Sequence, residues 1–137
     1  MLLATWIYVS TSCIDAAATN AELDKIVSVS RIRNASMSVT GALLFSGERF
    51  AQCIEGPEAA ICALRADIMG DRRHREIHTL TEGAIHSRYF DAWSLAYAGP
   101  ATFVSRQLEC SLQDARTGSS QAGANIRLLL HQFAESV

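Results

Sequence analysis

Short apolar runs alternate with segments of helical spacing along the first hundred residues. Residues 2–10 form a short aromatic and β-branched run, which is typical of a largely buried strand. Thr19 and Glu22 have the spacing of a capping box, which satisfies free amide groups at a helix start. A helix is therefore expected from there to about Asn34. Its apolar face, spaced i, i+3, i+4, i+7, comprises Leu23, Ile26, Val27 and Ser30.

The next segments predict a hairpin followed by a second helix. Residues 39–45 and 49–54 are strand-like, and the short turn between them contains Gly47, so we expect them to pair antiparallel. Gly56-Pro57 then favours a helix start with proline at the first helical position, and this helix should end near Gly70. Its apolar stripe comprises Ile61, Leu64 and Ile68.

Two further strands, expected at residues 77–84 and 92–97, complete the predicted sheet. The order strand, helix, strand, strand, helix, strand, with one extra strand, is the split β-α-β pattern of a ferredoxin-like α+β sandwich. We expect a five-stranded mixed sheet with two helices on one face, formed by a domain of residues 1–98. Residues 99–137 should form two C-terminal helices that cover either the free face of the sheet or a second subunit.

Composition is typical of a soluble globular protein. Of the 137 residues, 49% are hydrophobic and 19% charged, which suits one domain with a core and argues against disorder. A net charge of -2 gives no reason to expect nucleic acid as a partner. Scattered histidines, and four cysteines without a C-x-x-C pair, predict no metal site and reduced thiols. The first ten residues resemble neither a signal peptide nor a membrane span, so we expect a cytoplasmic protein without membrane contact.

Gln52 stands out because it places a neutral amide inside the apolar strand run 50–54. A buried side-chain amide that is left without partners costs about 1–3 kcal/mol. Something polar should therefore face Gln52, either another side chain or a bound heteroaromatic ligand. A surface glutamine on a half-exposed strand is the alternative that the pattern alone leaves open.

Six short pieces of the sequence, in the same order, resemble the BLUF domains, a family that senses blue light using FAD. The pieces are Tyr8-Val9-Ser10, Arg31-Ile32-Arg33-Asn34, Val39 to Leu44, Phe50 to Pro57, Asp71 to His74 and Arg88 to Leu95. Each piece is short, and the resemblance depends on all of them being in register over residues 2 to about 97.

The resemblance implies that a flavin ring lies between the two helices that pack on the sheet. Ile26 from the first helix and Ile68 from the second would contact the faces of the ring. Phe50 and Ile54 would line it from the strand. Without the resemblance, all four would be interpreted as ordinary core residues. The implied cofactor is FAD, and FMN or riboflavin could occupy the same pocket in recombinant protein.

Polar residues are implied to hold the edge and tail of the flavin. Asn34, preceded by Arg33, would hold the carbonyl and imide edge, although a helix C-terminal asparagine in the left-handed conformation is also common. Arg73 and His74 would lie near the ring or the phosphate tail, or else form a solvated basic pair. Asp67 should point to solvent or pair with an arginine, because a carboxylate close to a phosphate is unfavourable.

The resemblance assigns the photochemistry to Tyr8 and Gln52. The phenol would give an electron and then its proton after excitation, and the amide would relay that proton and remain rotated or tautomerised, which causes a small reversible red shift. Ser10 lies on the same strand face as Tyr8 and would bond near the amide. Trp93 and Leu95 would transmit the light state. Many relatives have methionine where this chain has Leu95, which puts the usual transmission route in doubt.

Together these implications describe a blue-light photoreceptor that is not an enzyme and signals to an unidentified protein partner. Residues 99–137 would serve output and oligomerisation, so a homo-oligomer is expected. Two alternatives on the same fold stay open. One is an acylphosphatase-like small hydrolase that holds a phosphate with Arg73 and Asn34, and the other is a non-photoactive interaction module.

Overall fold

The computed structural model describes residues 2–91, 94–99 and 104–133. Its strands are β1 (Leu3–Ser12), β2 (Thr40–Phe45), β3 (Arg49–Pro57), β4 (His74–Ile85) and β5 (Ala96–Ala98), and its helices are the 3-10 turn η1 (Ala16–Ala18), α1 (Thr19–Ser36), α2 (Glu58–Met69), α3 (Ser105–Arg116) and α4 (Ala122–Phe133). The strands form one sheet in the order β4-β1-β3-β2-β5. β5 runs parallel to β2 and the other neighbours pair antiparallel, which confirms the predicted mixed sheet of a ferredoxin-like α+β fold.

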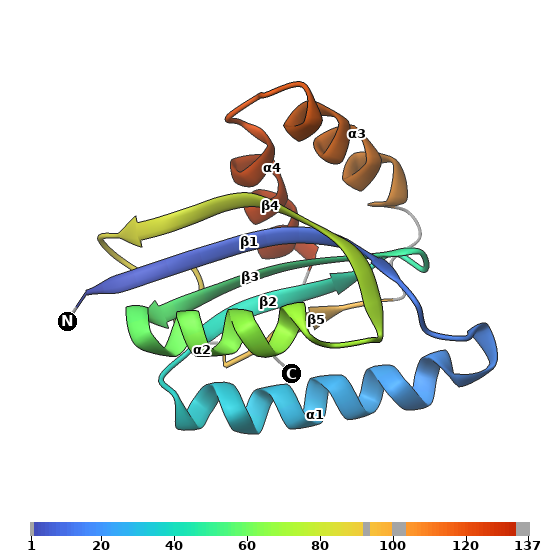
Figure 1. Ribbon diagram of the computed structural model, residues 1–137, viewed down its shortest axis with the longest axis horizontal. Coiled ribbons are helices and arrows are strands. Elements are labelled where there is room, and N and C mark those ends of the chain that lie inside the picture. The colour runs from blue at the N-terminus through green and yellow to red at the C-terminus, as the bar shows by residue number, and fades with distance from the viewer. Residues whose placement is uncertain (1, 92–93, 100–103, 134–137) are drawn as a thin grey trace.

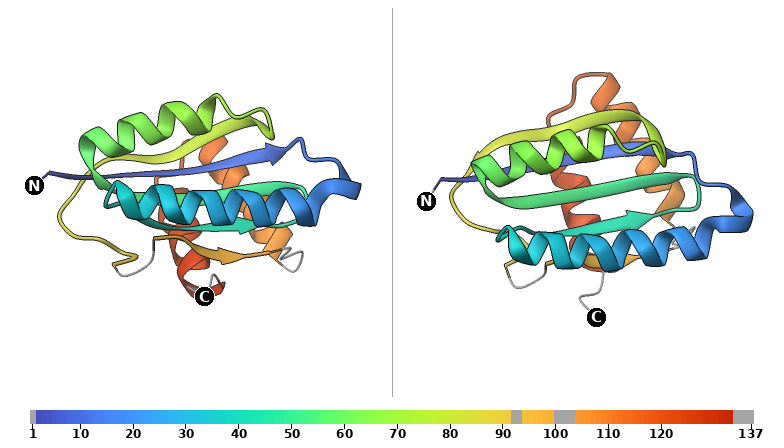
Figure 2. Two further views of the ribbon diagram at one scale, coloured as in Figure 1. Left: turned by 90° about the horizontal axis from the view of Figure 1, so that it is seen from below. Right: turned by 60° about the horizontal axis from the view of Figure 1, so that its bottom comes forward.

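The helices cover both faces of the sheet. α1 and α2 lie on one face, and α3 and α4 lie on the other (Figure 1, Figure 2). Side chains of β1 alternate accordingly, because successive strand residues point to opposite faces. Trp6 packs in a cluster with Leu64 of α2, whereas Ile7 packs in a cluster with Leu108 of α3 and Ile126 of α4. Of the two places considered for the C-terminal helices, they occupy the free face of the sheet.

Both helix starts differ from their predictions. Ala18 is the N-cap residue of α1 and makes no side-chain cap bond, and the Thr19 hydroxyl donates backward to the Asp15 carbonyl at 3.2 Å. The predicted capping box of Thr19 and Glu22 is therefore wrong, because η1 runs directly into α1 and makes Thr19 the first helical residue instead of the N-cap residue. β3 continues to Pro57, which is the N-cap residue of α2 rather than its first helical residue.

β4 and β5 also differ from their predicted ranges. β4 begins earlier, at His74, because its pairing with β1 extends to that residue. β5 has three residues, and Ser94 and Leu95 before it lie outside the strand. Their carbonyl groups instead accept hydrogen bonds from α1, at 2.8 Å from Asn34 Nδ2 to Ser94 and at 2.9 Å from Arg31 Nε to Leu95.

The four cysteines are free thiols in very different surroundings. Cys53 on β3 is fully buried. Cys13, Cys62 and Cys110 are exposed. Cys62 lies in an apolar run of the sequence, which favours burial, but it is exposed because the apolar stripe of α2 that faces the sheet does not include it. Among the described residues, no group of His, Cys, Asp or Glu is arranged to hold a metal ion, and no helix has the length and apolarity to cross a bilayer.

Candidate functional site

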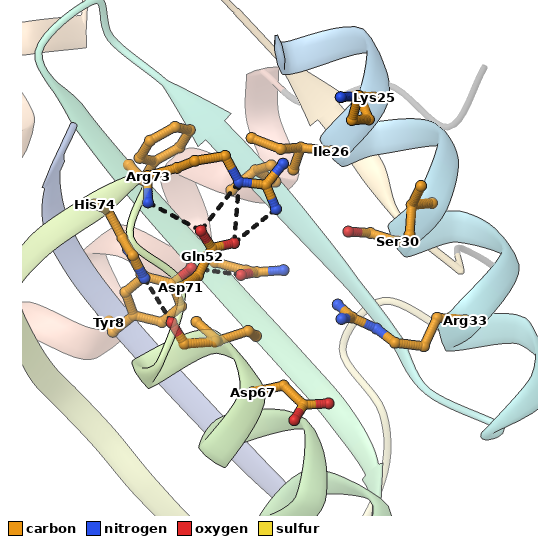
Figure 3. A pocket seen from close by; sticks show the side chains of 14 residues that line it. Tyr8, Lys25, Ile26, Ser30, Arg33, Gln52, Asp67, Asp71, Arg73 and His74 are labelled. Carbon is orange, nitrogen blue, oxygen red and sulfur yellow. Dashed lines mark hydrogen bonds and ion pairs between the residues drawn. The ribbon is translucent and has the colours of Figure 1, made fainter. Parts of the chain in front are cut away.

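A cavity of about 240 Å³ lies between α1 and α2, above the middle of the sheet (Figure 3). Ile26 and Arg33 line it from α1, Ile68 lines it from α2, and Phe50 and Gln52 line it from β3. The apolar side chains make its walls and the polar ones are spread along its floor and rim. A cavity with this combination suits a planar ligand that has an apolar body and a polar edge.

Tyr8 and Gln52 face each other at the floor of this cavity. They are directly opposite in the antiparallel register of β1 and β3, and both are almost completely buried. The Tyr8 hydroxyl donates to Gln52 Oε1 at 2.6 Å. The amide nitrogen of Gln52 points away from Tyr8 (Figure 3), and no described residue accepts a hydrogen bond from it. The polar partner expected for Gln52 is thus Tyr8, and the NH₂ group of the Gln52 amide stays available to a ligand.

Burial controls the protonation of Tyr8. Desolvation raises the pKa of the Tyr8 phenol well above its usual value of 10.0, the nearby Asp71 carboxylate raises it further, and the Arg33 guanidinium partly opposes both. The phenol is therefore neutral at physiological pH and is the donor in the bond to Gln52.

His74 forms the wall of the cavity beside Tyr8, with 5.8 Å between the two ring centroids. Its Nε2 lies 2.7 Å from the Ile68 carbonyl oxygen, and its Nδ1 lies 2.7 Å from Ser10 Oγ. A carbonyl can only accept, so Nε2 carries the hydrogen, and Nδ1 shares the second hydrogen bond of the ring with the Ser10 hydroxyl. The structure thus places Ser10 behind His74 and not against the amide of Gln52, where it was expected.

Arg73 is held at the rim by acidic side chains. Its Nη2 lies 2.7 Å from Asp71 Oδ2, its Nε lies 3.0 Å from Asp71 Oδ1, and a longer ion pair reaches Glu22 of α1 at 3.6 Å. The hydrogen bonds from Arg73 lower the pKa of Asp71, and Asp71 in turn raises the pKa of Arg73. Asp67 on the opposite rim is exposed to solvent, as one of the two expectations for it proposed.

Two buried polar atoms of α1 have no partner in the described part of the chain. Arg33 Nε is one, and Arg33 lines the cavity. Asn34 Oδ1 is the other: the residue is fully buried and its Nδ2 is used by the Ser94 carbonyl. Asn34 is also inside the helix, and the left-handed conformation considered for it belongs to Ser38. Unpaired buried polar atoms are costly, so these two atoms indicate a ligand with polar groups.

The other predicted site residues are divided between the cavity and the core. Ile26, Phe50 and Ile68 line the cavity with Tyr8, Arg33, Gln52, Arg73 and His74. Ile54 does not, because it is fully buried in the cluster that contains Trp6 and Leu64. Leu95 is buried in the cluster that contains Leu43 and Phe50, and Trp93 lies outside the described residues.

Sequence reasoning missed several residues that line the cavity. They are Lys25, Val29, Ser30, Leu43 and Asp71. The helical spacing of Ile26, Ser30 and Arg33 could have identified the α1 members, and Leu43 stands directly opposite Gln52 in the hairpin. Asp71 begins one of the pieces that carry the family resemblance, but no spacing pattern predicts where its side chain lies, because that depends on its hydrogen bonds with Arg73.

Comparison with known proteins identifies the family of this chain. The family model for BLUF, described as sensors of blue-light using FAD, matches residues 3–96. The photoactivated adenylate cyclase subunit beta of Euglena longa is 36% identical over 78 residues, which are 56% of this chain and 9% of that protein. The chain thus matches a small part of this curated relative.

Solved structures show the same fold over nearly the whole chain. The dark-state structure of BlrB, a BLUF protein, superposes with a TM-score of 0.77 at 29% identity and covers 96% of this chain and 98% of that one. A structure of Klebsiella pneumoniae BlrP1 with FMN and cyclic diGMP superposes with a TM-score of 0.66 at 27% identity, and covers 96% of this chain and 30% of that one. A BLUF domain is a photosensory module and not an enzyme. The chain therefore belongs to the BLUF family of blue-light sensors that use FAD.

Proposed function

We propose that the cavity between α1 and α2 holds the isoalloxazine ring of FAD and that Tyr8 and Gln52 form the light-sensitive pair. One observation supports this most strongly: a 2.6 Å hydrogen bond from a buried phenol to a glutamine at the cavity floor, whose amide nitrogen is left for a ligand. When bound, the flavin supplies absorption of blue light and an oxidising excited state.

The residues of the cavity fit such a ring. Ile26 and Ile68 project from opposite helices and would contact its two faces, with Phe50 beside them. The unpaired Asn34 Oδ1 and Arg33 Nε would meet its polar edge. A volume of about 240 Å³ lies below the ~300–1,000 Å³ typical of small-molecule sites. The site therefore suits the ring rather than a whole dinucleotide, and FMN or riboflavin should also bind.

The direction of the hydrogen bond between Tyr8 and Gln52 can be reversed without breaking any bond between heavy atoms. Loss of an electron makes a phenol strongly acidic, and Gln52 Oε1 is in place to take the proton of Tyr8. If the amide then rotates or tautomerises, it presents different donors and acceptors to the cavity and to Tyr8. Return of both the electron and the proton to Tyr8 regenerates the neutral phenol, and the dark arrangement is restored once the Gln52 amide regains its first orientation or tautomer, so the change is a reversible signal.

The output of the protein is proposed from its architecture. Residues 1–98 would be the sensory unit, and residues 99–137 would carry the signal to a protein partner and join copies into a homo-oligomer in the cytoplasm. The segment from Arg88 to Leu95, with Trp93 and Leu95, would connect the two. The hydrolase alternative gains nothing from the structure, because the Arg73 guanidinium that would hold a phosphate is already paired with the Asp71 carboxylate.

The absorption spectrum of the purified protein tests this proposal. We expect a flavin spectrum with a reversible red shift after blue light. Gln52→Leu should keep the flavin and lose the shift, because leucine can neither accept from Tyr8 nor donate to the ring. Gln107→Leu, the same substitution at an exposed position of α3, is the control and should behave as wild type. A colourless protein, or a normal shift in Gln52→Leu, would contradict the proposal.

A further inference from the structure

We infer that Glu55 is a positioning residue that couples the strand of Gln52 to α4, so that a change at Gln52 reaches the C-terminal helices through β3 itself. The inference rests on the proposed function, because it concerns how the light signal leaves the Tyr8 and Gln52 pair. It assigns that task to contacts on the face of the sheet opposite the cavity.

Glu55 is a buried carboxylate on β3, 2% exposed. Gln52 and Glu55 are three residues apart on this strand, so they point to opposite faces of the sheet. Cys53, which faces the same way as Glu55, packs in the cluster that contains Ile126 and Leu130 of α4. Glu55 therefore presents its charge toward the side that the C-terminal helices cover.

The Glu55 carboxylate binds backbone amides of the turn that follows β4, which comprises residues 88–90. The amide of Tyr89 lies 2.9 Å from Oε1 and 2.8 Å from Oε2, and the amide of Phe90 lies 2.8 Å from Oε1. Both carboxylate oxygens are thus acceptors for the same turn. Hydrogen bonds to a charged acceptor are stronger than neutral ones and depend on direction, so the turn should follow any displacement of β3.

Arg88 binds the same turn to the neighbouring strand ends. Its Nη1 donates to the Glu55 carbonyl at 3.2 Å and to Thr40 Oγ1 at 2.9 Å, and its Nη2 donates to the Ser38 carbonyl at 2.7 Å. The turn is therefore attached to β2 and β3 by side chain and main chain together. It is a rigid connection rather than a loose surface loop.

On its other side the turn contacts α4. The guanidinium of Arg127 lies 4.7 Å from the centroid of the Tyr89 ring, and the His131 ring lies 5.2 Å from Tyr89 and 5.7 Å from Phe90. The rings of Tyr89 and His131 meet edge to face, and those of Phe90 and His131 are tilted at 38°. Ring contacts of this kind, and a cation over an aromatic face, are attractive and depend on geometry. Glu55, the turn and α4 thus form a continuous chain of contacts that starts three residues from Gln52.

Hydrogen exchange in the dark tests the first link of this chain. Glu55→Gln replaces one acceptor oxygen with an NH₂ group, which meets the amide of Tyr89 as donor against donor. We expect the amides of Tyr89 and Phe90 to exchange roughly tenfold faster or more, because the Tyr89 amide loses its bond to Oε2 and the bonds of both amides to Oε1 lose their charged acceptor. Glu82→Gln is the control: this exposed glutamate of β4 pairs with Arg65 of α2, on the face of the sheet opposite the C-terminal helices. It should leave both amides as in wild type.

Exchange of residues 122–133 in FAD-loaded protein, in the dark and under blue light, tests the whole route. In wild type and Glu82→Gln we expect a light-induced change of exchange in α4. Glu55→Gln should keep the red shift and lose that change. Arg127→Gln removes the cation from the Tyr89 ring and leaves the buried Glu55 carboxylate in place. It should also keep the red shift and lose the light-induced change in α4, and it replaces Glu55→Gln as the test if that variant does not fold.

The outcomes separate this inference from the function it rests on. A wild type without a red shift overturns both. A wild type with a red shift but no change in α4 overturns the inference alone, and so does a variant at Glu55 or Arg127 that keeps the full α4 response. The inference would also be overturned if Glu82→Gln lost the light-induced change in α4, because the effect would then not be specific to the Glu55 carboxylate.

Discussion

Asn34 shows how one side chain can serve the fold and the site at once. Its Nδ2 holds the Ser94 carbonyl at 2.8 Å, and its Oδ1 is buried without a partner. A buried amide oxygen in this condition costs about 1–3 kcal/mol, which a polar ligand would recover. The residue is thus poised to bind a ligand on one side while it fixes the chain before β5 on the other.

Asn34→Ala should weaken flavin binding by roughly tenfold or more, because a ligand hydrogen bond and the anchor of Ser94 are lost together. Titration of the flavin-free protein with FAD, followed by flavin fluorescence, measures the dissociation constant. Ser36→Ala is the matched control, since its exposed hydroxyl bonds the Arg33 carbonyl within the same helix end. An unchanged dissociation constant in Asn34→Ala would refute a role in binding.

At the scale of single residues, the sequence predicts which residues belong to the site more reliably than it predicts which atoms they contact. Gln52 is polar within an apolar strand, so the need for a partner was evident, and Tyr8 proved to be that partner. Ser10 was placed on the correct strand face, but its bond to His74 depends on the Ile68 carbonyl, which orients the imidazole from another element. No pattern along the chain contains that information.

At the scale of elements, α4 approaches β4 very closely at Gly123. A Cβ atom at this position would lie 1.7 Å from Thr81 Oγ1 and 3.0 Å from Thr81 Cβ. The missing side chain of glycine therefore sets how near the helix packs to the sheet. A larger side chain at this position would push α4 away from the sheet.

Gly123→Ala should destabilise the protein by about 1–3 kcal/mol, because overpacking outweighs the ~1 kcal/mol that alanine gains over glycine in a helix. Gly70→Ala is the control: its Cβ would meet nothing nearer than Ala66 O at 3.5 Å, so it should be neutral or slightly stabilising. Urea unfolding measures both. Adding Thr81→Ala should recover part of the loss, and equal stabilities for the two alanine variants would disprove the packing argument.

The elements themselves were predictable where hydrophobic spacing decides them, and their ends were not. α1, the hairpin and α2 follow apolar patterns that the core requires. The start of α1 depends on a 3-10 turn that runs directly into the helix, and the short β5 reflects side chains of α1 that bind the carbonyls of residues 94 and 95. These are contacts between distant parts of the chain, which compete with local preference.

At the scale of the whole molecule, the sheet separates two apolar layers, and some ionisable side chains are buried within these layers. Cys53 lies in the layer toward the C-terminal helices, and burial raises the pKa of its thiol from 9.0 to about 12. The neighbouring Glu55 carboxylate adds to this rise and the Thr5 hydroxyl opposes it. The folded state therefore keeps a proton on this thiol that the unfolded chain loses earlier.

Stability should consequently fall in alkaline solution. A group with a raised folded pKa contributes fully below its unfolded pKa, here pH 9.0, and loses that contribution as pH rises toward about 12. By about pH 11 the loss due to Cys53 should be roughly 2–3 kcal/mol. Urea unfolding at pH 8 and pH 11 should show a smaller drop in Cys53→Ala than in wild type. If the free energy of unfolding falls equally in both proteins between pH 8 and pH 11, the thiol does not cause the alkaline loss of stability. This comparison does not depend on how much the Cys53→Ala substitution itself destabilises the protein.

The three exposed thiols have a practical consequence for following this molecule at work. Cys62 and Cys110 belong to helices on opposite sides of the sheet, and Cys13 lies beyond the end of β1, whereas the fourth thiol is shielded from reagents. Spin labels would therefore attach to natural positions that straddle the sheet. The distance between the labels on α2 and α3, recorded before and during illumination, would report directly whether the two helical layers shift against each other.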